Sequence, residues 1–404
     1  MATAFAPREL AFANESTFGD TTGTSMTYRI PVVSVELDDA WQRLADESIH
    51  VRMNASSPHV LGPRKGSIKF TCYVPGGNAV PSAALSASWF STLLGNALGG
   101  ASAPGFQQAT TTGTNADTIV DATSGASFAA GAMFAVGIRG TGAGGRFGVV
   151  GSTSSGTTIQ SLVAFPGSAA SGVQVWDALQ NYPTETPTTS QRFLLQWGAS
   201  GSSYYLHGAV CTGIEFSIPI GGLATCTFTY SGAVVTGPTT ATFPTVAALS
   251  DCLKVPTMNG LCFFQAHATT THATKCVTEI GLQLDLGTAI QETICGAGQY
   301  QTITGWARTK CVPKLTLKEY WDGTGNTSYA LDGAYKHFLF QNSADVTGKR
   351  WGFYMPRMYQ VDPVPMVEDV GGLMAQTTTW IGTENISPEN ATDLAKSAIR
   401  FAFA

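Results

Sequence analysis

The chain has 404 residues with a formal net charge of −5, and 44% of its residues are hydrophobic, so it can bury a substantial core. Only 12% of the residues are charged, and the acidic balance excludes a dedicated nucleic-acid binder with a basic stripe. No run approaches the ~20 apolar residues of a membrane span, and no basic segment precedes an apolar core at the start, so we expect neither a span nor a secretory signal.

The first predicted elements are two strands separated by charged turns. Residues 30–37 predict a strand that ends at the acidic turn Asp38-Asp39. Residues 62–66 (GPRKG) predict a basic turn, and residues 68–74 alternate apolar and polar side chains as in a half-buried strand. We interpret Arg64 and Lys65 as turn charges that keep an edge soluble or pair with acids, rather than as phosphate contacts.

The only helix that the pattern predicts lies in residues 81–100. Ser82 follows Pro81 and is a suitable N-cap, and Gly99-Gly100 would stop the helix. Because Gly95 weakens the last turn, we expect the helix to end near Leu94.

Residues 105–189 are rich in Gly, Ser, Ala and Thr and contain short strand patterns at 132–138, 146–150 and 158–163. We predict an inserted small β-barrel or sandwich module here. The remaining residues, 1–104 and 190–404, would form one discontinuous β-sandwich domain.

Longer alternating strands follow the module. Residues 214–220 and 224–230 flank Gly221-Gly222 and predict a hairpin, and residues 280–287 repeat the pattern. Further strands are predicted at 299–305, 314–321, 336–341, 350–355, 373–381 and 399–403. The expected fold class is therefore mainly β, with one flanking α-helix.

Catalytic motifs of serine hydrolases, P-loop proteins and zinc proteases do not occur. Residues 140–145 match Gly-x-Gly-x-x-Gly, but no helix is predicted after them to hold a phosphate, and glycine-rich composition explains the match. The paired carboxylates Asp38-Asp39 and Glu368-Asp369 are typical of solvated turns. We expect no enzyme and no cofactor.

The cysteine content is too low for a disulfide scaffold, so we expect reduced and mostly buried thiols. Four residues have spacing that zinc could use, namely Cys262, His267, His272 and Cys276. The spacing is loose, and both cysteines also fit as small apolar strand residues. We therefore predict no metal and retain the four residues as candidates for a zinc assay.

The order of these features resembles the major tail tube protein of long-tailed, non-contractile bacteriophages. The resemblance is carried by residues 15–19 (ESTFG), 66–70 (GSIKF), the helix ending in Leu93-Leu94-Gly95, the strand runs from Ile214 and Ile280, and residues 351–356 (WGFYMP). It covers about 20–100 and 190–404, and residues 105–189 resemble the extra modules of some members.

The resemblance implies a structural virion protein of the phage tail, assembled in the bacterial host cytoplasm. Its subunits would form six-fold rings through an intersubunit β-barrel, and the rings would stack into a tube. Implied partners are other copies of the chain, the tape-measure protein in the lumen, tail terminator and baseplate or tail-tip proteins at the ends, and double-stranded DNA that passes without specific binding.

Two sets of residues become candidates on this interpretation. Possible intersubunit contacts are Arg64, Lys65, Asp38 and Asp39. Possible lumen-facing residues, which could equally form an ordinary solvent face, are Glu215, Thr225, Thr227, Thr229, Gln283 and Asp285. The module would lie on the tube exterior.

Two rival functions remain. One is a receptor-binding or carbohydrate-binding β-protein of a tail fibre or adhesin, although the tryptophans show no repeat or cluster in the sequence. The other is a metal-stabilised or disulfide-stabilised hydrolase.

Overall fold

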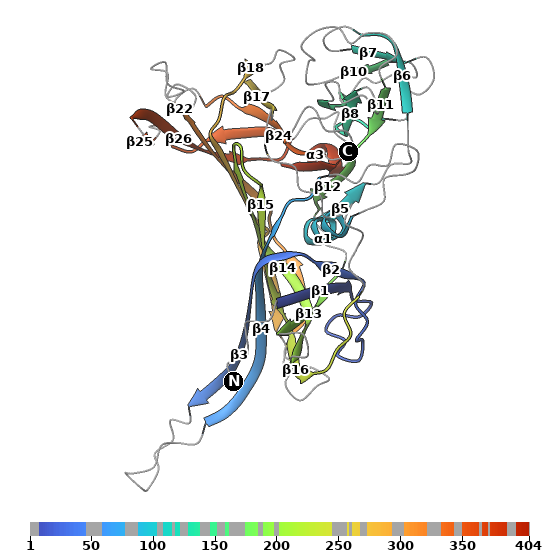
Figure 1. Ribbon diagram of the computed structural model, residues 1–404, viewed down its shortest axis with the longest axis vertical. Helices are drawn as coiled ribbons and strands as arrows, with labels where there is room; N and C mark the ends of the chain where they lie inside the picture. The colour runs from blue at the N-terminus through green and yellow to red at the C-terminus, as the bar shows by residue number, and fades with distance from the viewer. Residues whose placement is uncertain are drawn as a thin grey trace.

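The protein is mainly β in a computed structural model that describes residues 8–45, 59–76, 88–102, 108–114, 118–121, 128–137, 146–151, 158–160, 174–184, 189–197, 202–244, 257, 261–266, 273–292, 303–320, 333–342, 350–362, 366–370, 372–385 and 393–403 (Figure 1). Two α-helices lie in these ranges, α1 (Trp89–Leu98) and α3 (Asp393–Lys396). The strands are β1 (Arg8–Asn14), β2 (Tyr28–Ile30), β3 (Val32–Ala45), β4 (His59–Tyr73), β5 (Gly99–Ser102), β6 (Gln108–Thr114), β7 (Thr118–Asp121), β8 (Met133–Gly137), β9 (Arg146–Val149), β10 (Thr158–Gln160), β11 (Gln174–Asp177), β12 (Leu179–Pro183), β13 (Gln191–Trp197), β14 (Ser203–Pro219), β15 (Thr225–Gly232), β16 (Val234–Thr239), β17 (Leu261–Ala266), β18 (Ala273–Thr274), β19 (Glu279–Asp285), β20 (Thr288–Glu292), β21 (Ile303–Arg308), β22 (Val312–Tyr320), β23 (Lys336–Gln341), β24 (Trp351–Gln360), β25 (Met366–Val370), β26 (Leu373–Gly382) and β27 (Arg400–Phe403).

An antiparallel series of eight strands, here called the central sheet, runs through the middle of the molecule. Its order is β3-β4-β15-β14-β19-β22-β26-β25. The predicted hairpin around Gly221-Gly222 is confirmed as β14 and β15, and the predicted strands near 280, 314, 336 and 373 are confirmed as β19, β22, β23 and β26.

The long strand β14 belongs to two sheet regions. Its first half pairs with β13 and β16, and its second half pairs with β15 and β19. Aromatic side chains fill the space between these regions and the helix. Phe70 stacks on Phe228 at 5.4 Å between ring centroids, and Phe90 of α1 meets Phe228 edge-on at 6.0 Å. Such pairs stabilise the core beyond the area that they bury.

The predicted stop of helix α1 at Gly99-Gly100 is confirmed, whereas the expected end near Leu94 is wrong. The predicted N-cap, Ser82, lies outside the described residues. The side chain of Ser88, not Ser82, caps the helix by accepting a hydrogen bond from the backbone N–H of Ser91. The helix continues past Leu94 to Leu98, and Gly99 ends it in the left-handed conformation with φ of 93°. Gly95 is tolerated inside the helix because the neighbouring apolar residues are buried against the sheet.

The charged turns predicted near residue 38 and residue 64 are wrong. Asp38 and Asp39 lie within β3, and Arg64 and Lys65 lie within β4, so both segments belong to one long hairpin that projects from the body (Figure 1). Charged side chains are compatible with strands here, because pairing of β3 with β4 satisfies their backbone groups while the side chains can reach water.

A separate six-stranded sheet, in the order β10-β7-β6-β11-β8-β9, lies within residues 108–177. The next strand, β12, pairs instead with β5 and β27 of the large sheet, which favours a module boundary before Leu179. The six-stranded sheet packs closely on the body, since Met133 and Phe147 share a buried cluster with Leu339 and Tyr354.

Candidate functional site: the polar face of the central sheet

One face of the central sheet is polar and the other is buried in the core. In β14, Glu215 and Ser217 are exposed whereas the intervening Phe216 is 3% exposed. The same alternation holds in β4, β15, β19 and β22. We call the outward set the polar face; in these five strands it comprises Lys65, Ser67, Lys69, Thr71, Tyr73, Thr225, Thr227, Thr229, Ser231, Glu215, Ser217, Glu279, Gln283, Asp285, Lys314, Thr316 and Lys318.

The register places these side chains in continuous rows across the sheet. One row runs through Ser34, Thr71, Thr227, Glu215, Gln283 and Lys314 on six successive strands. The hydroxyl oxygens of Thr71 and Thr227 lie 2.8 Å apart, and the side-chain amide of Gln283 donates to the carboxylate of Glu215 at 3.3 Å. Such cross-strand pairs fix the side chains and keep the row hydrated on its outer side.

A shallow hollow of about 300 Å³ lies on this face over Gly281. A Cβ added to Gly281 would meet only the Cβ of Thr316, at 3.6 Å, so the glycine leaves open space. The polar side chains that line the hollow are Glu215, Ser217, Thr225, Thr227, Gln283, Lys314 and Thr316. Hydroxyl, amide and carboxylate groups with one ammonium group suit contact with water or with a polar chain, and neither His nor Cys lines this hollow.

The charge on the polar face and its edge strands is predominantly negative among the described residues. Six carboxylates lie here against four ammonium groups, namely Glu36, Asp38, Glu215, Glu279, Asp285 and Glu368 against Lys65, Lys69, Lys314 and Lys318. Lys318 forms an ion pair with Glu368, in which its ammonium group donates a hydrogen bond to the carboxylate. This hydrogen bond raises the pKa of Lys318. A face with an excess of carboxylates attracts a polyanion weakly.

The two edge strands of the central sheet each have one partner strand in the described part of the chain. β3 pairs with β4, and β25 pairs with β26. Edge strands of this kind are templates for pairing with another chain unless charge or shape prevents it. Val367 of β25 is 41% exposed, so an apolar side chain lies at this edge.

All six residues predicted to face a lumen lie together on the polar face. They come from the adjacent strands β15, β14 and β19, with Glu215 opposite both Thr227 and Gln283. The alternation in the sequence was the signal that found them. Thr71, Lys314 and Thr316 were missed as members of the same surface, since their strands become neighbours only in the folded chain.

The four residues predicted at a subunit contact lie side by side in the β3–β4 hairpin. Asp39 is opposite Gly66, and Lys65 is opposite Ala40, next along the ladder. The acidic and basic residues are therefore neighbours within one chain. A role at a contact between copies stays a prediction.

The structure describes half of the possible zinc-binding residues. Cys262 is buried in β17, and burial raises the pKa of its thiol to about 12, which disfavours the thiolate that zinc requires. Cys276 is exposed, and His267 and His272 lie outside the described residues. No group of three or more His, Cys, Asp or Glu side chains that could hold a metal ion occurs within the described ranges.

The six described cysteines are free thiols. Cys72, Cys211, Cys226 and Cys262 are buried, as expected for small apolar strand residues. Cys72 lies directly opposite Cys226 in the register of β4 and β15. Among the described helices, neither is long and apolar enough to cross a bilayer.

The fold and the site together define a mainly β protein whose central sheet has one polar face and two edge strands. No family model matches the sequence, and no curated protein matches it. One solved structure with partial similarity is a chain of the anti-feeding prophage (AFP) baseplate, determined by cryo-EM and symmetrised six-fold. The match covers 34% of this chain and 91% of that chain, with 10% sequence identity and a TM-score of 0.25.

Proposed function

We propose that the protein is a structural subunit of a phage tail, of the tail tube type. Copies join side by side through the edges of their central sheets and form a ring, and rings stack into a tube. The polar face lines the channel, which holds the tape-measure protein and later conducts DNA. Tail terminator and tail-tip proteins close the ends, and the module that contains the six-stranded sheet of residues 108–177 lies outside.

The observation that supports this proposal most is the central sheet itself. It has a polar face with continuous rows of hydroxyl and amide groups, and its two edge strands each have a single partner strand in the described part of the chain. Pairing of the β3 edge of one copy with the β25 edge of the next would satisfy both edges and close a barrel. A repeated contact of this type closes into a ring by rotation.

The excess of carboxylates on the polar face supports passage of DNA. Each phosphate that a protein cation neutralises releases counterions and strengthens binding, so a channel rich in cations would retain DNA. A face of threonine, serine and glutamine with more acids than bases would let the polyanion slide.

Negative-stain electron microscopy of the purified protein tests this proposal. We expect rings or striated tubes, and a protein that stays monomeric at high concentration would contradict assembly. Val367→Lys places a cation on the β25 edge and should abolish rings, because a charge there opposes strand pairing. Val361→Lys is the matched control, since Val361 is also exposed, at 43%, but lies outside β25.

A second function, binding of a receptor or carbohydrate, is favoured by one surface feature. The guanidinium of Arg357 lies over the ring of Tyr335 at 3.8 Å, and Tyr335 and Tyr359 are 39% and 38% exposed. Exposed tyrosine and arginine are typical of recognition surfaces. Glycan binding by a monomer or trimer that forms no rings, lost on Tyr359→Ser, would favour this function over the tube.

A further inference from the structure

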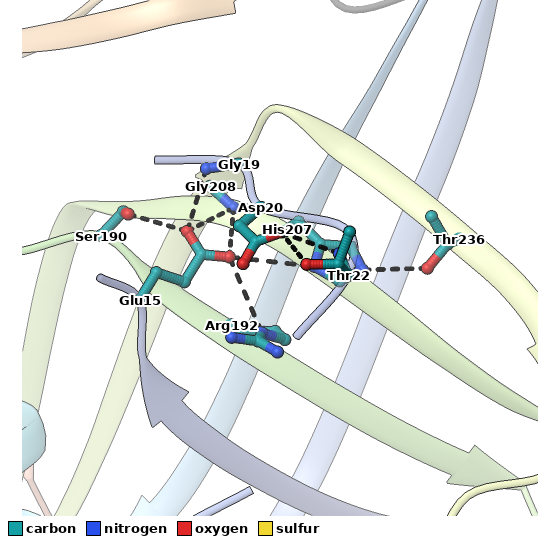
Figure 2. Close-up of polar contacts among 9 residues, drawn as sticks. All are labelled: Glu15, Gly19, Asp20, Thr22, Ser190, Arg192, His207, Gly208 and Thr236. Carbon is teal, nitrogen blue, oxygen red and sulfur yellow. Dashed lines mark hydrogen bonds and ion pairs between the residues drawn. The ribbon is translucent and has the colours of Figure 1, made fainter. Parts of the chain in front are cut away.

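The carboxylate of Glu15 is fully buried beneath the loop that connects β1 to β2 (Figure 2). It accepts hydrogen bonds from the N–H of Gly19 at 3.1 Å, from the N–H of Gly208 at 3.0 Å and from the hydroxyl of Ser190 at 2.8 Å. These donors come from the loop itself, from β14 and from the residue before β13. One side chain therefore ties residues 15–27 to two strands of the body.

Two further ionisable side chains face this carboxylate. The Nε of Arg192 lies 3.9 Å and the Nδ1 of His207 lies 3.8 Å from Glu15 Oε1. Both side chains are buried, with 8% and 1% exposed. The Nε2 of His207 shares a hydrogen bond with the Thr236 hydroxyl at 3.0 Å, whereas Nδ1 has no hydrogen-bond partner among the described residues. We call Glu15, Ser190, Arg192, His207 and the backbone of Gly19 and Gly208 the Glu15 cluster.

The loop held by this cluster covers a small apolar patch on the outer face of the sheet. Ala11, Leu194 and Tyr205 are buried there, with Met26 from the end of the loop and Ala241 and Phe243 from the segment after β16 packed against them. The loop also passes directly over Arg192, because a Cβ on Gly23 would lie 2.3 Å from its guanidinium. If the loop left the body, the part of the patch beneath Met26 and the guanidinium would meet water, while Ala241 and Phe243 would still pack on the rest.

We propose that residues 15–27 form a lid over this apolar patch and that acid opens the lid through His207. The positive charge of Arg192 already balances the negative charge of the buried Glu15 carboxylate. A proton on His207 adds a second buried positive charge near Arg192, beside the ring of Tyr205, which stacks on His207 at 5.7 Å between centroids. The backbone and the carboxylate of Asp20 favour the charged imidazole but do not outweigh its burial, whereas opening the lid hydrates the charge.

The neighbouring ionisable groups define the direction of the response. Burial lowers the pKa of His207 to about 4, and the positive charge of Arg192 contributes. The imidazole therefore binds its proton more tightly once the lid opens, and opening becomes more favourable as the pH falls from 6.5 toward 4. Asp20 in the loop is partly exposed, and bonds from Thr22 lower its pKa, so it stays ionised through this range and its charge favours the protonated His207.

Glu15 acts in the opposite sense. Burial raises the pKa of its carboxyl group, so a proton on Glu15 favours the closed lid. The hydrogen bonds from Gly208, Ser190 and Gly19 and the nearby Arg192 offset this effect because they stabilise the ionised form. His207 has fewer compensating contacts, and the net response is opening in acid.

Hydrogen exchange of the full chain, read by mass spectrometry and corrected for the intrinsic rate, tests the proposal without a variant. Between pH 7.5 and pH 5 we expect the opening equilibrium of the peptide that contains residues 15–27 to rise roughly 30-fold. Peptides of β4 and β15 should change little. A loop whose corrected exchange is flat across this range, or that opens only together with β4 and β15, would overturn the proposal.

Two substitutions assign the response to its residue. His207→Asn keeps a polar side chain beside Thr236 and should remove the acid-induced rise, while His337→Asn, at another buried histidine 2% exposed, should retain it. Glu15→Gln should raise loop exchange already at pH 7.5, because a neutral amide is a poorer acceptor for the surrounding donors. An acid-induced rise that persists in His207→Asn would show that another group drives it.

Discussion

The buried guanidinium of Arg400 donates a hydrogen bond to the carbonyl oxygen of Gly131, which lies 269 positions earlier in the chain. It also donates to the carbonyl of Ala395 at 2.6 Å and to the hydroxyl of Ser397 at 3.2 Å. Gly131 lies two residues before β8 of the six-stranded sheet, so its bond joins that sheet to the C-terminal strand of the body.

We expect Arg400→Met to destabilise the protein by about 2–3 kcal/mol, because the substitution leaves buried acceptors without donors. Urea unfolding measures the change. Arg29→Met is the control, since the Arg29–Glu9 ion pair is part-exposed and should contribute less than about 1 kcal/mol. Equal effects of the two substitutions would contradict this role for Arg400.

The end of α1 depends on a residue without a side chain. Because Gly99 has φ of 93°, Gly99→Ala should cost about 1–2 kcal/mol through backbone strain. Gly281→Ala is the matched control in open space on the polar face and should change stability by less than about 0.5 kcal/mol. Thermal unfolding distinguishes the two, and a Gly99→Ala protein as stable as the control would show that another feature ends the helix.

The polar face predicts a gain of DNA binding when cations are added to it. Thr227→Lys with Gln283→Lys should leave ring assembly intact, because both side chains lie on the polar face, away from the core, in strands that are already paired on both sides. Binding to double-stranded DNA should strengthen, and the slope of log affinity against log salt should steepen by about 2. The double substitution Thr227→Gln with Gln283→Asn is the control, because it changes the same two positions without adding charge.

If the assembled Lys variant bound DNA no better than the control, the polar face would not contact DNA. Electron microscopy of the same samples separates this outcome from loss of assembly.

Native alkylation should distinguish the cysteines by burial. Burial raises the pKa of Cys211 to about 12 and raises that of Cys72 further above its usual range, so neither presents a thiolate near neutral pH. Cys276 is exposed and should react with iodoacetamide before the buried cysteines of the described ranges. Peptide mass spectrometry measures the order, with urea-unfolded protein as the control in which all thiols react. Early labelling of Cys72 would show that β4 and β15 separate readily.

The local pattern of side chains was enough to predict the strands that alternate polar and apolar residues and the position of one helix. Alternation located β14, β15, β19 and β22 and placed Thr227 and Gln283 on a polar side, because successive side chains of a strand point to opposite faces. The glycine pair Gly99-Gly100 located the end of the helix, whereas the cap was predicted at Ser82 and is Ser88, since serine is a good N-cap at either position.

The pairing of strands and the burial of polar groups depend on tertiary contacts and could not be predicted from the sequence. Thr71 meets Thr227 across 156 positions, and Glu15 is enclosed by donors from Ser190 and Gly208 far along the chain. Register and burial arise from long-range pairing, which leaves no periodic signal near either residue. From the sequence alone, an acidic residue after a short strand, such as Glu15, is expected to be a solvated loop residue. Only the folded structure brings together the groups that bind it.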